Sequence, residues 1–285
     1  MLTKKSVLKN REVSYVSAYK LYQQTIQRPQ IIPTGVKRID ELLDGGLQIG
    51  RIVEICGQPT SAKSQLSLSI AVNVASRKNI ETIYVDTKHD LSGVVIRNML
   101  RSRRYTENVI AETLQKIRVA RIYSVEKLIE LFENLDKRMT DKDNSLVIII
   151  DSLPSLMYLH HGEAKFEGLN LLAESVLRMR KLVSRHQVAI LVVNIITCGR
   201  KWTPVEKKKP EEMRLQKPSL GKHWQTVPCV RLLSKWIIDS HAVSFYNFAN
   251  QMITGFEVSA RRNFIICIEK SDFTRSGRSC HIHHH

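Results

Sequence analysis

The chain has 285 residues, 43% of them hydrophobic, which is enough to bury the core of one large α/β domain. Its 44 lysines and arginines outnumber the 27 acidic residues, and the formal net charge of +17 favours a polyanionic partner such as nucleic acid. No apolar run approaches the roughly 20 residues that span a bilayer, and no apolar segment follows the N-terminus, so we expect an intracellular protein without a signal peptide or membrane anchor.

Residues 1–33 are basic and form a lead-in that is too short for a domain, whereas residues 34–285 are expected to form the core. Within the lead-in, four small or aromatic residues have the i, i+3, i+4, i+7 spacing of one helix face: Tyr15, Ala18, Tyr19 and Tyr22. Two interpretations stay open. This face packs on the chain's own core, or it docks on a neighbouring subunit.

A phosphate-binding loop is predicted after a short helix within residues 34–50 and a strand at residues 52–56. The loop matches G-x-x-x-x-G-K-[ST] except that Ala62 replaces the last glycine. In such loops backbone N–H groups hold phosphate oxygens, the lysine reaches the β- and γ-phosphates, and the hydroxyl binds magnesium. If Ala62 is left-handed, the cost is roughly 1–2 kcal/mol, which weakens nucleotide binding without preventing it. The predicted nucleotide-binding residues are Gly57, Gln58, Pro59, Thr60, Ser61, Ala62, Lys63, Ser64 and Gln65.

A second nucleotide motif is the apolar run at residues 146–152, which contains Asp151 near its end. This is how a buried parallel strand presents a carboxylate to a metal. Ser64 and Asp151 are therefore the predicted Mg²⁺ ligands, and ATP and Mg²⁺ are the expected cofactors. An ordinary strand-to-helix turn is the alternative for the loop, but the two motifs together favour a nucleotide site.

Strands and helices alternate along the rest of the core. The expected strands lie at residues 80–86, 117–123, 146–152 and 188–194, and the expected helices at residues 91–104, 125–138 and 165–186. This alternation predicts an α/β fold with a mostly parallel sheet and helices on both faces. Two further strands, at residues 230–238 and 264–269, are expected to extend the sheet in antiparallel fashion. Ligands then bind at the carboxyl ends of the parallel strands.

Residues 195–221 have no periodicity and are strongly basic, and loops this long are usually functional or disordered. We predict that this segment contacts a phosphodiester backbone and that its tryptophan stacks on a base. A solvated charged loop is the alternative. The predicted DNA-binding residues are Arg200, Lys201, Trp202, Lys207, Lys208, Lys209, Arg214 and Lys217.

Several motifs together resemble one family over residues 15–271. A glutamate, Glu54, precedes the loop, a glutamine, Gln65, follows Lys-Ser, and a Leu-Gly-x-x-Trp element ends at Trp224. With Thr34-Gly35, the Asp151-Ser152 strand end and Asn194, these features resemble the RecA-type recombinases, and within them the eukaryotic recombinase paralogues. The C-type paralogue is the most similar, and the D-type is close.

This resemblance implies a RecA-like P-loop NTPase core with the C-terminal antiparallel extension, in the nucleus. The loops at residues 195–221 and 159–168 would line the DNA-binding side. The Tyr15-Val16-Ser17-Ala18 run is similar to a polymerisation element, so Tyr15 and Ala18 would form an oligomer interface. The implied partners are single- or double-stranded DNA, other paralogues in a heteromeric complex, and the main strand-exchange recombinase, in repair of double-strand breaks and in meiotic recombination. No membrane partner is expected.

Three departures from the family pattern concern hydrolysis. Besides Ala62, Lys88 stands where active members carry the glutamate that polarises water, and Ile195 stands where they carry glutamine. Losing the water-positioning residue removes much of the catalysis, although Asp90 is an alternative carboxylate. We therefore expect no catalytic residue and an ATP-binding subunit with weak or absent DNA-dependent ATPase. The alternatives are an autonomous ATPase and strand-exchange recombinase, or a non-catalytic RecA-fold interaction protein.

Overall fold

The computed structural model describes residues 17–19, 22, 30–140, 144–160, 165–198, 216–236, 263–272 and 277–283. The chain divides into two compact units, Met1–Gln30 and Ile31–His285. In the first unit, Ala18 and the neighbouring Tyr19 are helical and exposed. Among the described helices, none is both long enough and apolar enough to cross a membrane.

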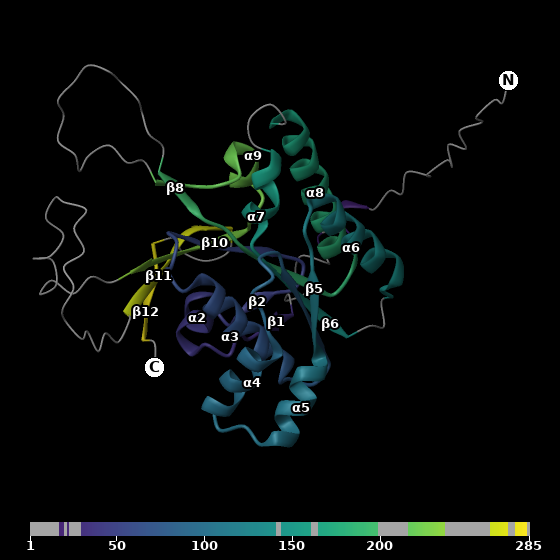
Figure 1. Cartoon of the computed structure of the whole chain (residues 1–285). Coiled ribbons are helices and arrows are strands. Elements are labelled where there is room, and N and C mark those ends of the chain that lie inside the picture. Colours follow the sequence, from purple (N-terminus) through teal and green to yellow (C-terminus); the bar gives the residue numbers. More distant parts are fainter. Residues whose placement is uncertain are drawn as a thin grey trace, which may run out of the picture. The chain divides into compact units, whose positions relative to one another are not determined.

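The second unit is built on one eight-stranded sheet with the order β12-β11-β10-β3-β7-β6-β4-β5 (Figure 1). Six neighbouring strands are parallel: β10 (Val230–Trp236), β3 (Ile52–Gly57), β7 (Val188–Val193), β6 (Ser145–Asp151), β4 (Ile80–Asp86) and β5 (Ile117–Arg121). Two strands continue the sheet in antiparallel fashion: β11 (Asn263–Ser271) and β12 (Ser279–His283). The predicted mostly parallel sheet with an antiparallel extension is confirmed.

One strand of the expected extension is placed differently. The strand predicted at residues 230–238 is β10, and it pairs in parallel with β3, with Val230 opposite Val53 and Ser234 opposite Gly57. The antiparallel part therefore begins one strand later, at β11, and β12 was not predicted. The parallel pairing matters because it brings β10 alongside the strand that enters the phosphate-binding loop.

The central strands are buried on both faces, which explains why their sequences are continuously apolar rather than alternating. All seven residues of β6 and all six residues of β7 are buried. One face packs against α2 (Lys37–Leu42), α3 (Lys63–Ala75), α4 (Gly93–Ser102) and α5 (Glu107–Lys116). The other face packs against α6 (Val125–Arg138), α7 (Leu153–Met157), α8 (Lys165–Arg185) and α9 (Gly221–Gln225), so helices cover both faces as predicted (Figure 1).

The helix boundaries follow local capping. Ser92 Oγ accepts a hydrogen bond from Val95 N and Ser124 Oγ accepts one from Lys127 N, which fixes the starts of α4 and α6. Helix α5 and the 3₁₀ turn η1 (Tyr158–His160) were not predicted. Two short antiparallel pairs were also not predicted: β1 (Ile31–Ile32) with β2 (Leu47–Gln48), and β8 (Ile196–Cys198) with β9 (Gln216–Pro218).

Candidate nucleotide-binding site

The carboxyl ends of β3, β4 and β6 form the candidate site. Strands β4 and β6 end side by side, because Asp86 is the register partner of Asp151. Strand β3 ends at Gly57, where the predicted phosphate-binding loop begins and leads into α3. Both nucleotide motifs therefore lie at one edge of the sheet, where open α/β sheets bind their ligands.

Gly57 occupies a position that no larger residue can take. A Cβ atom there would collide with the Ser234 carbonyl of β10 and with Ser61 Oγ. Further along the loop, Thr60 (φ 65°) and Ala62 (φ 57°) are left-handed. The conformation at Ala62 is the one for which glycine is suited, so the alanine carries a penalty of roughly 1–2 kcal/mol.

Lys63 lies in the loop with its side chain almost fully buried. Its Nζ donates hydrogen bonds to the Gln58 carbonyl at 2.5 Å and to Ser61 Oγ at 3.2 Å. Burial and, to a smaller extent, the neighbouring charge of Lys88 together lower the pKa of Lys63 to about 8. The lysine is thus directed into the loop, where a phosphate oxygen can replace the carbonyl as its partner.

The loop residues fit a triphosphate. Lys63 begins the 13-residue helix α3, and no side chain caps the N-terminus of this helix at Ala62. The first-turn N–H groups and the helix dipole together favour an anion. The loop residues Gly57 to Gln65 would hold the phosphates of a nucleotide, and the Lys63 ammonium would contact the terminal phosphates.

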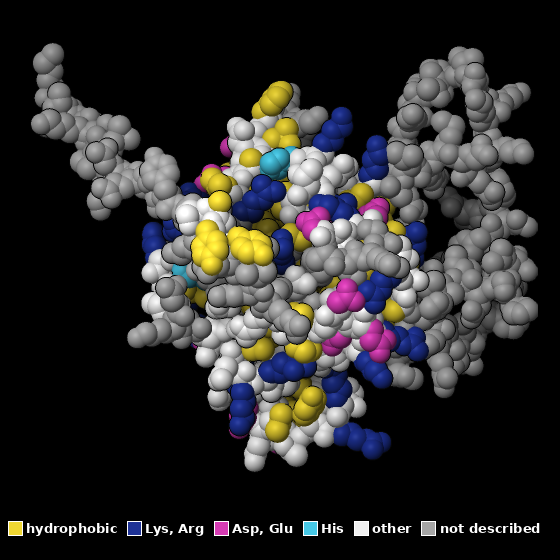
Figure 2. Space-filling model, turned by 180° about the vertical axis from the view of Figure 1, so that it is seen from behind, with side chains coloured by type: hydrophobic (Ala, Val, Ile, Leu, Met, Phe, Trp, Pro, Cys, Tyr) yellow, Lys and Arg dark blue, Asp and Glu magenta, His cyan; other side chains and the backbone are white. Residues whose placement is uncertain are grey.

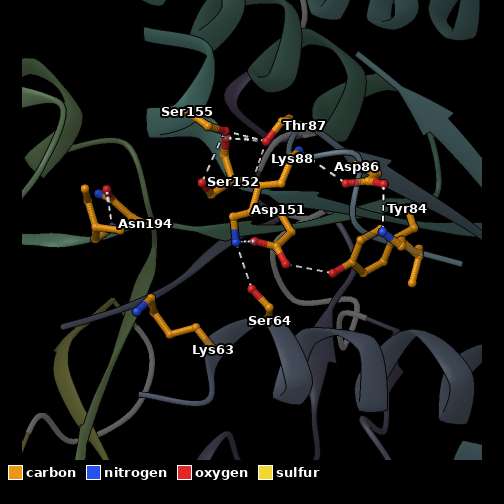
Figure 3. Close-up of polar contacts among 12 residues, drawn as sticks. Lys63, Ser64, Tyr84, Asp86, Thr87, Lys88, Asp151, Ser152, Ser155 and Asn194 are labelled. Carbon is orange, nitrogen blue, oxygen red and sulfur yellow. Dashed lines mark hydrogen bonds and ion pairs between the residues drawn. The ribbon is translucent and has the colours of Figure 1, made fainter. Parts of the chain in front are cut away.

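The two predicted magnesium ligands, Ser64 and Asp151, lie on either side of one ammonium group (Figure 3). Lys88 Nζ donates to Ser64 Oγ at 2.9 Å and to Asp151 Oδ1 at 2.8 Å. The second carboxylate oxygen of Asp151, Oδ2, accepts a hydrogen bond from the Tyr84 hydroxyl at 2.8 Å. Burial raises the pKa of Tyr84, and the Asp151 charge raises the pKa further, so its hydroxyl remains a donor.

This arrangement does not fit a magnesium ion while Lys88 stays in place. The Ser64 hydroxyl and one Asp151 oxygen already contact a cation. Within the described part of the chain, no cluster of three histidine, cysteine, aspartate or glutamate side chains offers an alternative metal site. The structure therefore brings the two predicted ligands together, but around a lysine.

The turn that carries Lys88 is fixed to both β4 and β6. Asp86 Oδ1 accepts from the backbone N–H groups of Lys88 at 3.2 Å and His89 at 2.8 Å. Thr87 Oγ1 accepts from Ser152 N at 2.7 Å.

Asp90, the alternative carboxylate for hydrolysis, is exposed in this turn. Sequence analysis did not single out the roles of Tyr84 and Asp86, although a tyrosine and an aspartate at the end of a buried strand are a usable signal.

A buried polar cluster lies beside the loop, formed by Glu54, Asn194, Trp224 and Arg231. Glu54 is fully buried, and its Oε1 accepts from Asn194 Nδ2 at 2.5 Å and Trp224 Nε1 at 2.7 Å. Its Oε2 accepts from Arg231 Nε. Three residues that carry the family resemblance, Glu54, Asn194 and Trp224, are therefore joined in this cluster through Glu54. The side-chain amide nitrogen of Asn194 donates to Glu54 Oε1 and to the Ser219 carbonyl.

Most of the predicted DNA-binding residues lie outside the described residues: Arg200, Lys201, Trp202, Lys207, Lys208, Lys209 and Arg214. Lys217 is described, and it is exposed on β9. Strand β9 pairs with β8, so the two described strands that flank the basic segment lie side by side, just after the carboxyl end of β7. On the face drawn in Figure 2, lysines and arginines are spread out rather than gathered in one patch. DNA binding stays a prediction.

The predicted oligomer interface also stays a prediction. Tyr15 lies outside the described residues, and Ala18 is exposed in the N-terminal unit. Of the second predicted DNA-side loop, at residues 159–168, residues 161–164 lie outside the described part.

Fold and loop together define a RecA-like P-loop protein. The crystal structure of the RadB recombinase matches with a TM-score of 0.62 at 15% identity, covering 88% of this chain and 94% of that one. At this identity the match shows the fold alone. The chain belongs to the Rad51 family, because the family description "Rad51" matches residues 27–216.

Curated relatives agree with this assignment. The chain is 30% identical over 218 residues to "DNA repair protein RAD51 homolog 4" of Mus musculus, covering 75% of this chain and 63% of that protein. It is 23% identical over 246 residues to "DNA repair protein RAD51 homolog 3" of Dictyostelium discoideum, covering 78% of this chain and 61% of that protein. The predicted resemblance to RecA-type recombinase paralogues is confirmed. The chain spans somewhat less than two thirds of the length of these relatives.

Proposed function

We propose that this chain is an ATP- and DNA-binding recombinase paralogue that acts in the nucleus as a subunit of a paralogue complex. Its role is homologous-recombination repair of double-strand breaks, including meiotic breaks, alongside the main strand-exchange recombinase. The observation that carries this proposal is the phosphate-binding loop, with Lys63 directed into it, in a chain of the Rad51 family. The names of its relatives, which are DNA repair proteins, support the repair role.

ATP binding is supported by the loop geometry. The N–H groups at the start of α3 have no side-chain cap, so they are available to a phosphate. Lys63 Nζ points into the loop, where it donates to the Gln58 carbonyl. When bound, a nucleotide would supply a triphosphate that orders the loop. Lys63 would bind its terminal phosphates and Gly57 would keep β10 close to the loop. Because the Ser64 and Asp151 oxygens already contact Lys88, no magnesium-dependent step is part of the proposal.

DNA binding is supported by charge and by the position of the β8–β9 pair. The net charge of +17 favours a polyanion, and the basic segment begins beside the carboxyl end of β7. Lysine and arginine contacts to phosphates release counterions, so affinity for duplex DNA should fall with salt at a slope near −0.9 per phosphate neutralised. An affinity that does not change with salt would favour the non-catalytic interaction protein.

An autonomous ATPase and recombinase is the competing function, and Lys88 argues against it. A lysine cannot act as the carboxylate that positions water, and its ammonium already contacts Asp151. The direct discriminating measurement is strand exchange by the purified chain alone. Products formed without any partner would support the autonomous enzyme.

The experiment that tests the subunit role is purification of the tagged chain from its source cells, followed by identification of co-purifying proteins. A second recombinase paralogue at stoichiometric amount is the expected result. A Tyr15→Ala and Ala18→Glu double variant should lose this partner, whereas a variant at an exposed lysine of α6, Lys127→Ala, should keep it. Retention of the partner by the double variant would contradict the predicted interface.

A further inference from the structure

The ammonium group of Lys88 lies between the two predicted magnesium ligands. Its Nζ lies 2.9 Å from Ser64 Oγ and 2.8 Å from Asp151 Oδ1 (Figure 3). In P-loop NTPases the loop hydroxyl and the aspartate after the neighbouring strand hold the nucleotide's magnesium. We infer that the Lys88 ammonium is a built-in cation that replaces Mg²⁺, so that this chain binds a nucleoside triphosphate without a divalent metal. The inference rests on the proposed nucleotide binding and adds that this binding needs no divalent cation.

The backbone at Lys88 is held in place from two directions. The Asp86 carboxylate accepts hydrogen bonds from Lys88 N at 3.2 Å and from Leu91 N at 3.1 Å, which fixes the turn after β4. Thr87 joins the same turn to β6 through Ser152 N at 2.7 Å. The base of the Lys88 side chain is therefore fixed relative to Asp151, as expected of a pre-positioned group.

Asp151 needs the positive charge that Lys88 supplies. Its side chain is only 4% exposed, and an ionised buried carboxylate is costly unless it is paired. The Tyr84 hydroxyl satisfies one oxygen at 2.8 Å but brings no charge. Among the described residues, Lys88 forms the salt bridge of Asp151, at 2.8 Å. Removing Lys88 would leave a carboxylate that an external cation is attracted to neutralise.

A metal ion and the Lys88 ammonium exclude each other at this position. Magnesium binds oxygens at about 2.0–2.1 Å in octahedral geometry. An ion on Ser64 Oγ or Asp151 Oδ1 would then lie within about 5 Å of Lys88 Nζ, and the two cations would repel each other. An ammonium has three N–H donors, and two of them go to Ser64 and Asp151. The third is available to a phosphate oxygen, because the side chain is 37% exposed.

The test is binding of a fluorescent ATP analogue to the full chain, once in excess EDTA and once in millimolar magnesium chloride. We expect the wild-type Kd to differ by less than about twofold between the two buffers. Lys88→Ala should bind about tenfold more weakly than the wild type in EDTA and should recover on addition of magnesium, a change of roughly 1.4 kcal/mol. Lys127→Ala, which removes an exposed lysine from α6, should match the wild type in both buffers.

The outcomes separate the inference from the proposed function. Wild-type binding that requires magnesium would overturn the built-in cation and leave the nucleotide site standing, and this arm needs no variant. Binding that is absent in both buffers, or unaffected by Lys63→Ala, would overturn the nucleotide site itself. Lys88→Ala that binds equally well with EDTA and with magnesium would also overturn the inference.

Discussion

Asn194 and Glu54, which are 140 residues apart in the sequence, are joined by a 2.5 Å hydrogen bond from Asn194 Nδ2 to Glu54 Oε1. The bond ties the segment after β7 to the strand that enters the phosphate-binding loop. The same carboxylate also accepts from Trp224 of α9 and Arg231 of β10. One buried acid therefore aligns four segments around the loop.

Glu54→Gln should destabilise the fold strongly. The glutamine keeps an acceptor for Asn194 and Trp224, but it removes the charge that pairs with Arg231, which is only 7% exposed. Among the described residues, Arg231 would keep only its longer contact with the half-exposed Glu269, at 3.7 Å. Removing one partner of a buried ion pair costs about 3–5 kcal/mol, so we expect a loss at or below the lower end of that range. Urea unfolding measures the loss. Glu107→Gln is the matched control, since Glu107 pairs with two arginines on the surface, and it should leave the unfolding midpoint unchanged. Equal effects of the two variants would contradict the role of the cluster.

Ala62→Gly should strengthen the loop. Ala62 has φ 57°, where a Cβ costs roughly 1–2 kcal/mol, and glycine removes that strain at the expense of a more flexible unfolded chain. We expect a net gain of about 0.5–1 kcal/mol in unfolding free energy, together with tighter nucleotide binding. The same change at Ala111, an exposed position within α5, should instead cost about 1 kcal/mol. A loss of stability at both positions would show that the left-handed loop conformation is wrong.

ATP turnover should be slow. Lys88 cannot position water, and its ammonium contacts the Asp151 carboxylate at 2.8 Å. Phosphate release measured with single-stranded DNA should therefore stay close to that of Lys63→Ala, the variant that lacks the lysine proposed to bind phosphate. Brisk DNA-stimulated release that Lys63→Ala abolishes would contradict this prediction and favour the autonomous enzyme.

Local patterns predicted most of the core but not the contacts that decide its chemistry. The apolar run of β6 and the Lys63-Ser64 motif can be read from neighbouring residues, so the strand, the loop and their shared edge were predicted. Helix α5 was missed because the expected helix ended at residue 104 and no element was assigned between it and the strand expected at residue 117.

The contacts of Lys88 could not be predicted from the sequence, because they depend on the folded structure. A lysine at that position indicates a lost catalytic carboxylate, but its contact with Ser64, 24 residues away, depends on how the β4 turn packs over the loop. The Glu54 to Arg231 pair spans 177 residues and depends on the parallel pairing of β10 with β3, which the expected antiparallel extension did not include. Long-range register, rather than local pattern, was the missing information.

Asp136 should make the pairing of α6 with α8 sensitive to acid. Its carboxylate accepts from Lys181 Nζ at 2.5 Å and lies 3.2 Å from His186 Nε2. Burial acts to raise the pKa of Asp136, but the hydrogen bonds from Lys181 and His186 outweigh it, so the pKa lies below the ordinary value of 3.8. When folding lowers the pKa of a carboxylate, that carboxylate stabilises the folded state at every pH above its pKa in the unfolded chain. This stabilisation is lost as the pH falls through its pKa in the folded chain.

Asp136→Asn should therefore lower the unfolding free energy by about 2 kcal/mol at pH 7, since it removes hydrogen bonds made to a charged group. The difference from the wild type should shrink below about pH 4, as the wild-type carboxylate becomes protonated. Urea unfolding between pH 7 and pH 3 measures both curves. Glu112→Gln, at an exposed position of α5, should follow the wild type throughout. A difference that does not shrink below about pH 4 would mean that the charge of Asp136 is not what stabilises the fold.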